Sequence, residues 1–519
     1  MNMAERRPQP SFGATGDTRP HAIVVGAGVG GLSAGALLAA RGYRVTIVDP
    51  LDAPGGRAYA WRQDGFTFDA GPTIITAPWL FQELWRDCGG RLEDDLDLRP
   101  NSPFYRIRFH DGTYFDYSGD RAAMEAEVAR FEPADVAGYR SFMEESRQIY
   151  EVAFEQLADK PFHSMAFTAK VLARLVRLGG YRSVYSVVAK HFRNEKLRNI
   201  FSFHPLLIGG NPFSATSFYC LIAHLEGKYG VHHAIGGTNA LVEGIAGLVR
   251  RNGGTFRLNE TVDEILTEGR NATGVRLASG EQIRADIVVS NCDPAMTYGK
   301  LLKKLPRRRW TDRKIAGGDY SMSLFVWYFG TNRRYEDVDH HTMLFGPRYR
   351  GLLDDIFRRK RLAEDFSLYL HRPSASDPSV APEGCDAFYV LSPVPNLASG
   401  TDWATAAETY RARIQKHLEE TVLPDLGKHI ISSRIATPAD FRDRLLSWQG
   451  AAFALEPKLL QSAWFRPHNK SEELDNLYLC GAGTHPGAGL PGVVMSARIV
   501  AGLVPDPALL AKTNLSSAG

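Results

Sequence analysis

The sequence predicts an α/β fold with an added α+β part, in which distant segments of the chain share one domain. The first observation is a strand, a glycine-rich loop and a helix in residues 21–40, followed by a second strand. The second is that strand, glycine-rich loop and helix occur again in residues 474–503. The third is the length of 519 residues, which exceeds one ordinary core and predicts two or three domains.

The first glycine-rich loop has the spacing of a phosphate-binding turn. An apolar strand at residues 22–25 leads into a G-x-G-x-x-G motif, a helical pattern covers residues 32–40, and a second apolar strand covers residues 45–48. This order opens a Rossmann-like dinucleotide-binding domain, in which free amides at the helix start hold the phosphates. We therefore assign four glycines to a dinucleotide: Gly26, Gly28, Gly30 and Gly31.

An acidic residue and a second glycine-rich loop follow the second strand. Gly31 is expected to let helix and strand pack closely, and Asp49 lies 18 residues after it, where a carboxylate can accept hydrogen bonds from ribose hydroxyls. A solvated turn aspartate is the alternative. Gly55, Gly56 and Arg57 then form a cationic glycine-rich loop that suits further phosphate contacts, although a plain turn has the same composition.

The carboxyl-terminal loop repeats the arrangement. A short strand at residues 474–479 is followed by six glycines and alanines among residues 481–489, and a helical pattern covers residues 493–503. The amino end of that helix again presents free amides to a polar group. We assign to the cofactor Gly481, Gly483, Thr484, Gly492 and Val493. His485 is either a proton-transfer residue or a residue that shapes the loop.

Several strings resemble one family along nearly the whole chain. DAPGGRAYAW followed by GFTFDAGPTIIT, and GAGTHPGAGLPGV at residues 481–493, resemble the carotenoid desaturases of the phytoene desaturase type, within the amine-oxidase-like flavoproteins. Shorter strings at residues 202–213, 362–374 and 461–469 resemble them too. The resemblance implies FAD as cofactor and phytoene and carotenoid intermediates as substrates. It also places the loop of Gly55, Gly56 and Arg57 beside the cofactor, Gly71 and Pro72 near the flavin, and the Val262 backbone at the adenine.

The resemblance and the pattern together predict a divided domain structure. We expect residues 1–20 to form a loose tail, and residues 21–80, 235–300 and 470–505 to form the FAD-binding domain. The substrate domain is expected at residues 81–134, 206–234 and 301–469, and a helical, basic, membrane-associating subdomain at residues 135–205.

A basic amphipathic stretch supports the membrane expectation. From Lys160 to Arg198 there are nine Lys or Arg and one acidic residue, Glu195, interleaved with apolar residues: Phe167, Val171, Leu172, Leu175, Val176, Leu178, Val184, Val187 and Val188. Such a stretch can lie on an anionic bilayer surface, or it can be the solvated face of a packed helical subdomain. A second cluster surrounds Trp310 and comprises Lys300, Lys303, Lys304, Arg307, Arg308, Arg309 and Arg313. The net charge of +3 gives no reason to expect nucleic acid.

The chemistry on a hydrocarbon substrate needs few polar groups. The flavin takes a hydride, and a weak base or water takes a proton from the neighbouring carbon. Glu144 and Arg147 lie three apart on an expected helix, as proton-handling residues or as a surface ion pair. The aromatic strand at residues 323–329 lines an apolar cavity or packs in the core. Without a second nucleotide motif, oxygen or a membrane quinone is the expected electron acceptor.

The cysteines bear on the cellular location of the protein, and two alternative functions remain open. Five single cysteines without paired spacing indicate no metal site and a reducing cytoplasm, and we expect the protein at the inner face of the cell membrane. The nearest rival function is another carotenoid-acting flavoenzyme, such as a hydroxycarotenoid desaturase or an isomerase. A non-catalytic prenyl-lipid carrier is the rival from another class, and it would lack intact glycine-rich loops.

Overall fold

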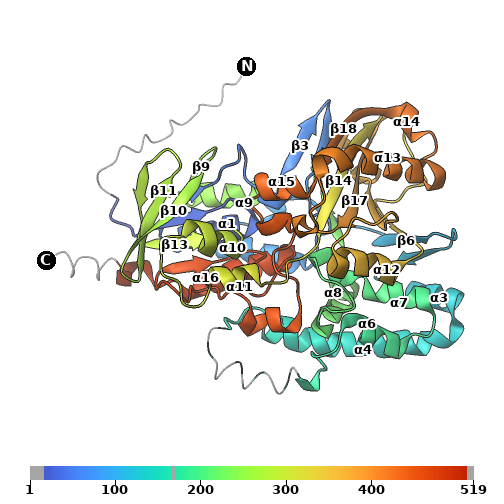
Figure 1. Cartoon of the computed structure of the whole chain (residues 1–519), viewed down its shortest axis with the longest axis horizontal. Coiled ribbons are helices and arrows are strands. Elements are labelled where there is room, and N and C mark those ends of the chain that lie inside the picture. The colour runs from blue at the N-terminus through green and yellow to red at the C-terminus, as the bar shows by residue number, and fades with distance from the viewer. Residues whose placement is uncertain are drawn as a thin grey trace.

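Two sheets and a helical lobe make up the molecule. The computed structural model describes residues 17–510, apart from residues 163, 165–167, 169, 170, 172, 173 and 175. In Figure 1 a parallel sheet with its helices occupies the left half and a larger mixed sheet the upper right. Helices α3 (Arg121–Phe131), α4 (Val136–Tyr150), α6 (Val184–His191) and α7 (Glu195–Ser202) lie together at the lower right and belong to one helical lobe.

The parallel sheet is built from three separate stretches of the chain. Its strands pair in the order β19 (Leu477–Leu479), β13 (Ile287–Ser290), β1 (His21–Val25), β2 (Arg44–Val48) and β9 (Thr255–Arg257). Helix α1 (Val29–Ala40) packs against both α9 (Thr238–Arg251) and α16 (Leu490–Leu503), and all of it except Ala40 is buried. The first and last parts of the sequence therefore lie side by side, which confirms the predicted Rossmann-like fold with a discontinuous sheet.

A small antiparallel sheet extends this half. It consists of β10 (Val262–Glu268), β11 (Asn271–Leu277) and β12 (Gln282–Arg284). Val262, Ile265, Val275 and Leu277 of this sheet share a core with residues of β1 and β19. Two short helices follow, α10 (Pro294–Met296) and α11 (Asp312–Ala316).

The second large sheet has seven strands and forms the other half of the molecule. The order is β18 (Ile430–Ala436), β14 (Ser323–Thr331), β17 (Asp386–Val394), β16 (Leu368–His371), β15 (His341–Phe345), β6 (Tyr105–Phe109) and β7 (Tyr114–Tyr117). All neighbours are antiparallel except β15 and β6. Two further pairs are β3 (Ala60–Gln63) with β4 (Phe66–Asp69), and β5 (Leu98–Pro100) with β8 (His232–Ala234).

The aromatic strand β14 serves both of its predicted roles, on alternate faces. Phe325, Trp327 and Phe329 pack in one core with α13 (Trp403–Thr421). Leu324 and Tyr328 belong to the other core and line a cavity. Because successive strand side chains point to opposite faces, core packing and cavity lining are divided between odd and even positions.

The helical lobe packs several helices around one apolar core. Its helices are α3 (Arg121–Phe131), α4 (Val136–Tyr150), α6 (Val184–His191), α7 (Glu195–Ser202) and α8 (Leu221–Tyr229). The other helices are α2 (Pro78–Asp87), α12 (Tyr349–Leu353), α14 (Leu426–His429) and α15 (Pro438–Asp443).

The described part of the basic amphipathic stretch is a packed helix. Val184, Val187 and Val188 of α6 are buried in the lobe core, and Lys190 pairs with Glu145. Val176 is 51% exposed. Phe167, Leu172 and Leu175 lie outside the described residues. The structure of α6 therefore matches the second of the two interpretations, a packed helical subdomain with a solvated basic face.

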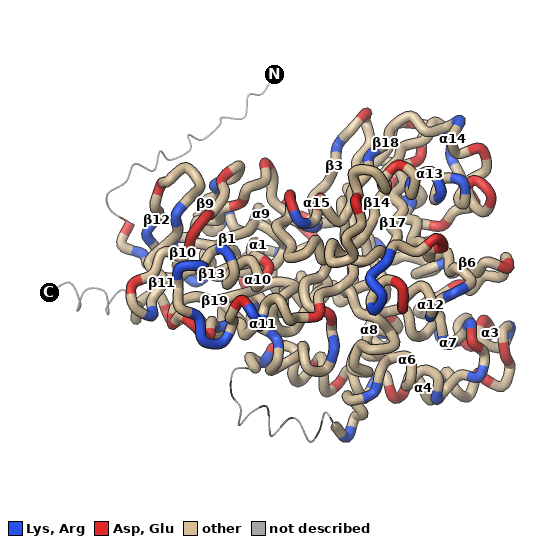
Figure 2. The backbone as a smooth tube through the Cα atoms, in the orientation of Figure 1, with Lys and Arg blue, Asp and Glu red and all other residues tan. Residues whose placement is uncertain are grey.

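Figure 2 shows basic segments beside α11, where the second predicted basic cluster lies. Several of its members have partners: Lys304 pairs with Glu264 at 2.9 Å, and Arg307 with Asp312 at 2.6 Å. The Lys314 ammonium lies 3.7 Å from the centre of the Trp310 ring. Among the described helices, none has the length and apolar content that crossing a membrane requires.

Candidate active site

A cavity of about 550 Å³ lies between the two halves and is lined by residues from both ends of the chain. Such a volume is typical of ligand pockets, which are 300–1,000 Å³. The predicted cofactor residues that line it are Gly26, Gly28, Gly30, Asp49, Gly55, Gly56, Arg57, Gly71, Pro72, Gly481, Gly492 and Val493. The structure thus brings together two glycine-rich loops that are about 450 residues apart in the sequence.

Two helices begin at this cavity. The first turn of α1 contributes Val29 and Gly30 to the wall, and the first turn of α16 contributes Leu490 and Gly492. No side chain of the described residues caps either helix, and neither first turn carries an acidic residue. The amides of the first turn have no intrahelical partner, so both helix ends can bind anionic groups.

Asp49 is held by the first glycine-rich loop. Its Oδ2 accepts a hydrogen bond from the Ala27 N–H at 2.6 Å, and its Oδ1 accepts one from the Leu51 N–H at 2.8 Å. The side chain is buried, which raises the pKa of the carboxyl, while the two backbone hydrogen bonds oppose that rise. Each carboxylate oxygen keeps a second lone pair for a ligand hydroxyl.

Asn291 joins the two glycine-rich loops, and the sequence analysis did not assign it to the site. It follows β13 and lines the cavity. A Cβ atom on Gly28, Gly30 or Gly481 would lie 2.6–2.8 Å from the Asn291 side-chain amide. Three glycines are therefore needed because one asparagine fills the space between the loops. The signal available in the sequence is the position of Asn291 directly after a buried strand.

Arg57 lines the cavity but already has protein partners. Its Nε donates to the Ala452 carbonyl at 2.7 Å and its Nη2 donates to Ser447 Oγ at 2.8 Å. Burial lowers the pKa of the guanidinium, and the charge of Asp293 opposes that. The guanidinium thus ties the glycine-rich loop to the segment after α15, at the boundary of the two halves.

Four predicted cofactor residues are outside the described cavity lining. A Cβ on Gly31 would lie 2.0 Å from the Gly26 carbonyl oxygen, so Gly31 permits the predicted close packing of helix on loop. Thr484 is fully buried and donates to the Gly481 carbonyl at 3.0 Å, so its hydroxyl organises the loop. A Cβ on Gly483 would meet Pro294, and Val262 is buried at the start of β10.

His485 lies in the cavity wall. The ring is nine-tenths buried, and its centroid is 4.7 Å from that of Phe162. Burial lowers the pKa of His485 to about 4, so the imidazole is neutral at pH 7. A neutral ring can accept a proton or shape the loop, so both sequence interpretations are compatible with its position.

Glu144 and Arg147 are not part of this site. They form an ion pair of 2.6 Å on α4, where their side chains are 51% and 41% exposed. Arg147 also pairs with Glu151. Neither residue is among the described residues that line the cavity. The proton-handling hypothesis for this pair is therefore replaced by its alternative, a surface ion pair, because water surrounds both groups.

The described lining of the cavity includes Asp49, Asp440 and one further carboxylate. This third carboxylate is buried in the deeper, apolar part of the cavity. That carboxylate is Glu226 of α8, which is 1% exposed. Its Oε1 accepts a hydrogen bond from Tyr105 Oη at 2.7 Å, and its Oε2 lies 3.2 Å from His204 Nε2. Apolar neighbours in the wall include Leu206, Leu221, Ile222, Leu225, Leu324, Met343, Phe345 and Leu391.

A chain of hydroxyl groups crosses the wall beside Gly71. Tyr389 Oη donates to the Gly71 carbonyl at 2.9 Å and lies 3.1 Å from Thr73 Oγ1. Thr73 Oγ1 is 2.8 Å from Tyr369 Oη, which in turn is 2.6 Å from His341 Nδ1. The predicted flavin-side segment is thus connected through hydrogen bonds to a histidine behind the wall.

Residues 29–505 match the family of flavin containing amine oxidoreductases. The chain is 50% identical over 502 residues to the neurosporene-forming phytoene desaturase of Cereibacter sphaeroides, with 96% of each protein covered. It is 45% identical to the lycopene-forming phytoene desaturase of Pantoea ananas, covering 93% of this chain and 98% of the relative. The chain belongs to the phytoene desaturases of this flavoprotein family.

Solved structures support the same fold for this phytoene desaturase family member. An oxidoreductase from Methanosarcina mazei has a TM-score of 0.63 at 15% identity, covering 92% of this chain and 98% of that protein. Putrescine oxidase bound to putrescine has a TM-score of 0.62 at 14% identity, covering 93% and 98%. At such identities the likeness concerns the fold alone.

The enzyme is an FAD-dependent oxidoreductase. The residues present fit this cofactor. The uncapped amides at the starts of α1 and α16 suit phosphate and flavin oxygens, and Asp49 suits ribose hydroxyls. A Cβ atom at Gly28, Gly30 or Gly481 would lie 2.6–2.8 Å from the Asn291 side-chain amide, so no larger residue fits at these three positions of the loops.

Proposed function

We propose that this enzyme desaturates phytoene by successive dehydrogenations, to products of the neurosporene or lycopene type. The observation that carries the proposal is the continuity of the cavity, which joins the glycine-rich loops to an apolar wall built by β14, β15, β17 and α8. A long hydrocarbon needs such a wall, because it has no polar group to pair with protein donors. The names of the relatives support the substrate class.

The chain's own residues have to bind, orient and deprotonate the substrate. Bound FAD would supply the oxidant that removes a hydride from an allylic carbon. Aliphatic and aromatic side chains exclude water from the deep part of the cavity, so the delocalised cation is protected from hydration. The new double bond forms when a proton leaves the neighbouring carbon.

We assign proton uptake to Glu226. It is the buried carboxylate next to Ile222 and Leu225 in the apolar wall, and Tyr105 and His204 fix both of its oxygens. A carboxylate held in an apolar wall can take up a proton from a hydrocarbon bound beside it, since a general base acts within hydrogen-bond reach of the proton that it removes. His485, which is neutral at pH 7, is the second candidate near the carboxyl-terminal loop.

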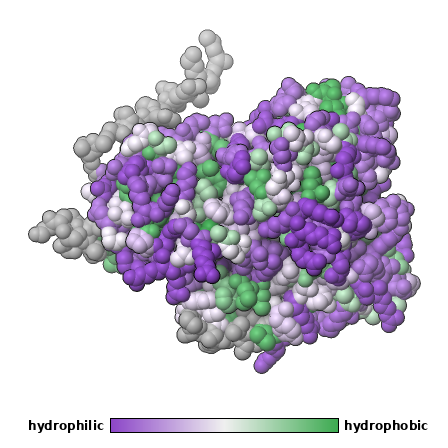
Figure 3. Space-filling view, viewed as in Figure 1, coloured by the Kyte–Doolittle hydropathy of each residue, from purple (hydrophilic) through white to green (hydrophobic). Residues whose placement is uncertain are grey.

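We propose a membrane surface as the source of the substrate. Leu460 is 70% exposed and Phe465 is 50% exposed, and the neighbouring Ser462 and Ala463 line the cavity. Figure 3 shows an apolar patch, coloured green, in the lower part of the molecule. Exposed aliphatic and aromatic side chains at a cavity mouth can enter the boundary of a bilayer. The predicted location at the inner face of the cell membrane, and oxygen or quinone as electron acceptor, belong to the same proposal.

We also propose that the chain divides into an FAD-binding, a substrate and a helical region. In this proposal the glycines and Asp49 that line the cavity hold FAD. A hydroxycarotenoid desaturase or an isomerase would share the whole site, and only its product differs. A lipid carrier without flavin would need no uncapped helix ends beside Asp49.

Expression in a phytoene-producing host tests the proposal. Chromatography of the pigments should show neurosporene or lycopene with the natural enzyme. The Gly28→Val variant should leave phytoene unconverted, because the added side chain enters the space of the Asn291 amide. Extracts that contain only phytoene despite soluble, FAD-loaded enzyme would exclude phytoene desaturation.

A further inference from the structure

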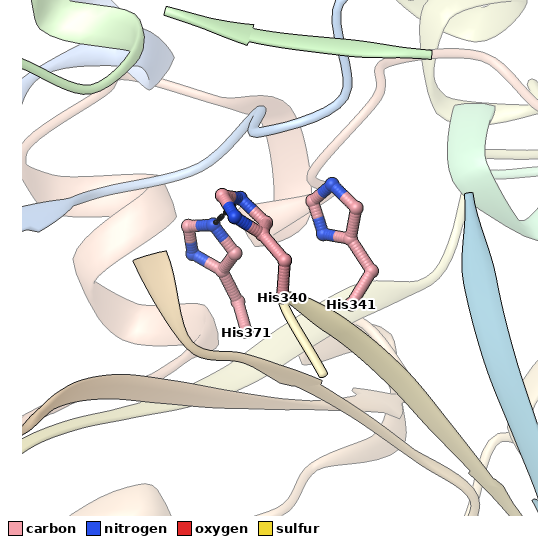
Figure 4. Close-up of side chains that lie close together, drawn as sticks. All are labelled: His340, His341 and His371. Atoms are coloured by element: carbon pink, nitrogen blue, oxygen red, sulfur yellow. Dashed lines mark hydrogen bonds between the residues drawn. The ribbon is translucent and has the colours of Figure 1, made fainter. Parts of the chain in front are cut away.

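Three buried histidines lie together at the ends of two neighbouring strands. His340 and His341 are at the start of β15, and His371 ends β16, where it pairs with His341 across the sheet. One ring nitrogen from each lies within 4.8 Å of the others. Figure 4 shows the three imidazoles side by side on the same side of the strands. Their exposed fractions are 8%, 1% and 2%.

Second partners orient two of the rings. Ser376 Oγ lies 2.9 Å from His340 Nδ1, and Tyr369 Oη lies 2.6 Å from His341 Nδ1. With Nδ1 engaged in each ring, Nε2 is the other nitrogen. His341 Nε2 has no partner among the described residues, and His340 Nε2 lies within hydrogen-bond distance of His371 Nε2, at 3.1 Å. Metal-binding histidines are usually held in this way, with the second ring nitrogen on a polar group.

Several nitrogens of the cluster lack protein partners. His341 Nε2 and His371 Nδ1 have no hydrogen-bond partner among the described residues, and the same holds for His233 Nε2. The His233 ring lies 4.7 Å from that of His340. Buried polar atoms are nearly always satisfied, so the unpaired Nε2 atoms of His341 and His233 point to a missing ligand.

We propose that His340, His341 and His371 bind one divalent zinc ion. His371 Nε2 and His340 Nε2 are 3.1 Å apart. Two nitrogens on a tetrahedral zinc with bonds of 2.0–2.1 Å are about 3.3 Å apart, so this pair needs little movement. Three imidazole ligands suit zinc, and the fourth position is open to water or to His233.

The charges around the cluster permit a cation. A neutral imidazole keeps a lone pair that can bind metal. Arg372 is nearby, but its charge is paired with Asp386 at 2.9 Å.

The ion would fix one end of the cavity wall. His341 holds Tyr369, and Tyr369 is linked through Thr73 to Tyr389 and the Gly71 carbonyl. A zinc ion bound to His341 therefore restrains the hydroxyl chain beside the predicted flavin segment. Its role is positioning, because none of the three histidines is among the described residues that line the cavity. This inference does not depend on the identity of the substrate.

Metal analysis of the intact FAD-loaded protein tests the site. Tag-free enzyme is incubated with zinc chloride, dialysed and analysed by plasma mass spectrometry, and its affinity is measured by competition with a chromophoric chelator. We expect about one zinc per chain. The His340→Gln/His371→Gln variant should retain almost none. The Tyr369→Phe variant should bind about tenfold more weakly, since it removes the hydroxyl that orients His341.

A matched control separates the cluster from other histidines. His468 is also buried and lies 3.1 Å from the Trp464 carbonyl, so His468→Gln changes a histidine outside the cluster. It should bind zinc like the natural enzyme. Zinc-free natural enzyme after dialysis, or equal zinc content in the natural enzyme and the double variant, overturns the proposal. The first outcome needs no variant, so a folding defect cannot produce it.

Discussion

The Asp49 carboxylate accepts a hydrogen bond from the Ala27 N–H at 2.6 Å, so the end of β2 is tied to the loop after β1. A second hydrogen bond, from the Leu51 N–H, fixes the other oxygen. The carboxylate thus has a defined orientation before any ligand arrives. Preorganised acceptors lose less conformational entropy when a ribose binds.

Asp49→Asn should weaken FAD binding. The amide keeps the size of the side chain, but its NH₂ group cannot accept from a backbone N–H, and the charge is lost. Hydrogen bonds to charged groups contribute about 1.5–3 kcal/mol, which predicts FAD dissociation constants raised by about 10- to 100-fold. Fluorescence titration of the apoenzyme with FAD measures the change.

Asp52→Asn is the matched control, because Asp52 is exposed and its described hydrogen bond is with Tyr59. Its FAD affinity should be that of the natural enzyme. Equal affinity of the Asp49 and Asp52 variants would remove Asp49 from the cofactor site.

Glu226→Gln should slow catalysis with little effect on flavin content. The amide keeps the size of the carboxylate but cannot take up a proton, and general bases contribute about 10²- to 10⁴-fold to the rate. We expect a fall in kcat of that order with an unchanged KM. Assays with phytoene in liposomes measure both. Glu144→Gln, which changes a surface ion pair, should retain the natural rate. A Glu226→Gln enzyme with natural kcat would disprove the assignment.

The glycine-rich loops and their partners could be predicted because their spacing follows from local chemistry. The turn, the helix start and the acidic residue at the end of the next strand all lie within residues 26–49, so the pattern is visible in one stretch. The second loop was predicted from the same order of strand, glycines and helix in residues 474–503, and the resemblance added FAD as the cofactor. Asn291 was missed because its function arises only when strands β1 and β13 pair.

The stability of the folded protein should decrease as the pH decreases, because of His485. Burial lowers the pKa of His485 to about 4, below the value of about 6.5 in an unfolded chain. Between those values the unfolded state binds a proton that the folded state does not, so stability decreases as pH falls from about 6.5 to about 4. At most about 3 kcal/mol is lost through this group.

His485→Gln should therefore reduce the pH dependence of unfolding. The thermal-unfolding midpoint of the FAD-loaded variant should drop less between about pH 7 and about pH 5 than that of the natural enzyme. His110→Gln changes an exposed histidine and should leave the pH dependence as it was. Identical drops in the natural enzyme and the His485 variant would mean that burial does not perturb this ring.

Liposome binding should depend on the apolar residues at the cavity mouth. The Leu460→Glu/Phe465→Glu variant places two charges where exposed apolar side chains would enter a bilayer. Loss of the two apolar side chains should weaken binding to anionic liposomes by about tenfold or more, as measured by co-sedimentation. Ile431→Glu changes a side chain of β18 that is also 50% exposed, on the other half of the molecule, and should bind normally. Equal losses in the two variants would argue against a defined membrane face.

The site beyond the loops could not be predicted from the sequence, because its residues meet only in the folded chain. Glu226 looks like an ordinary helix residue until Tyr105 and His204 enclose it. His341 and His371 are 30 residues apart and become neighbours through the pairing of β15 with β16. Glu144 and Arg147 had suitable spacing, but spacing on a helix does not reveal which face is buried.

Anaerobic mixing of the oxidised enzyme with phytoene-containing liposomes tests the central claim most directly. If one cavity holds FAD next to the hydrocarbon, the flavin absorbance should bleach and one desaturated product should form for each flavin reduced. Liposomes without phytoene should cause no bleaching. An oxidised flavin spectrum that persists with phytoene, in enzyme that fully retains FAD, would contradict the account.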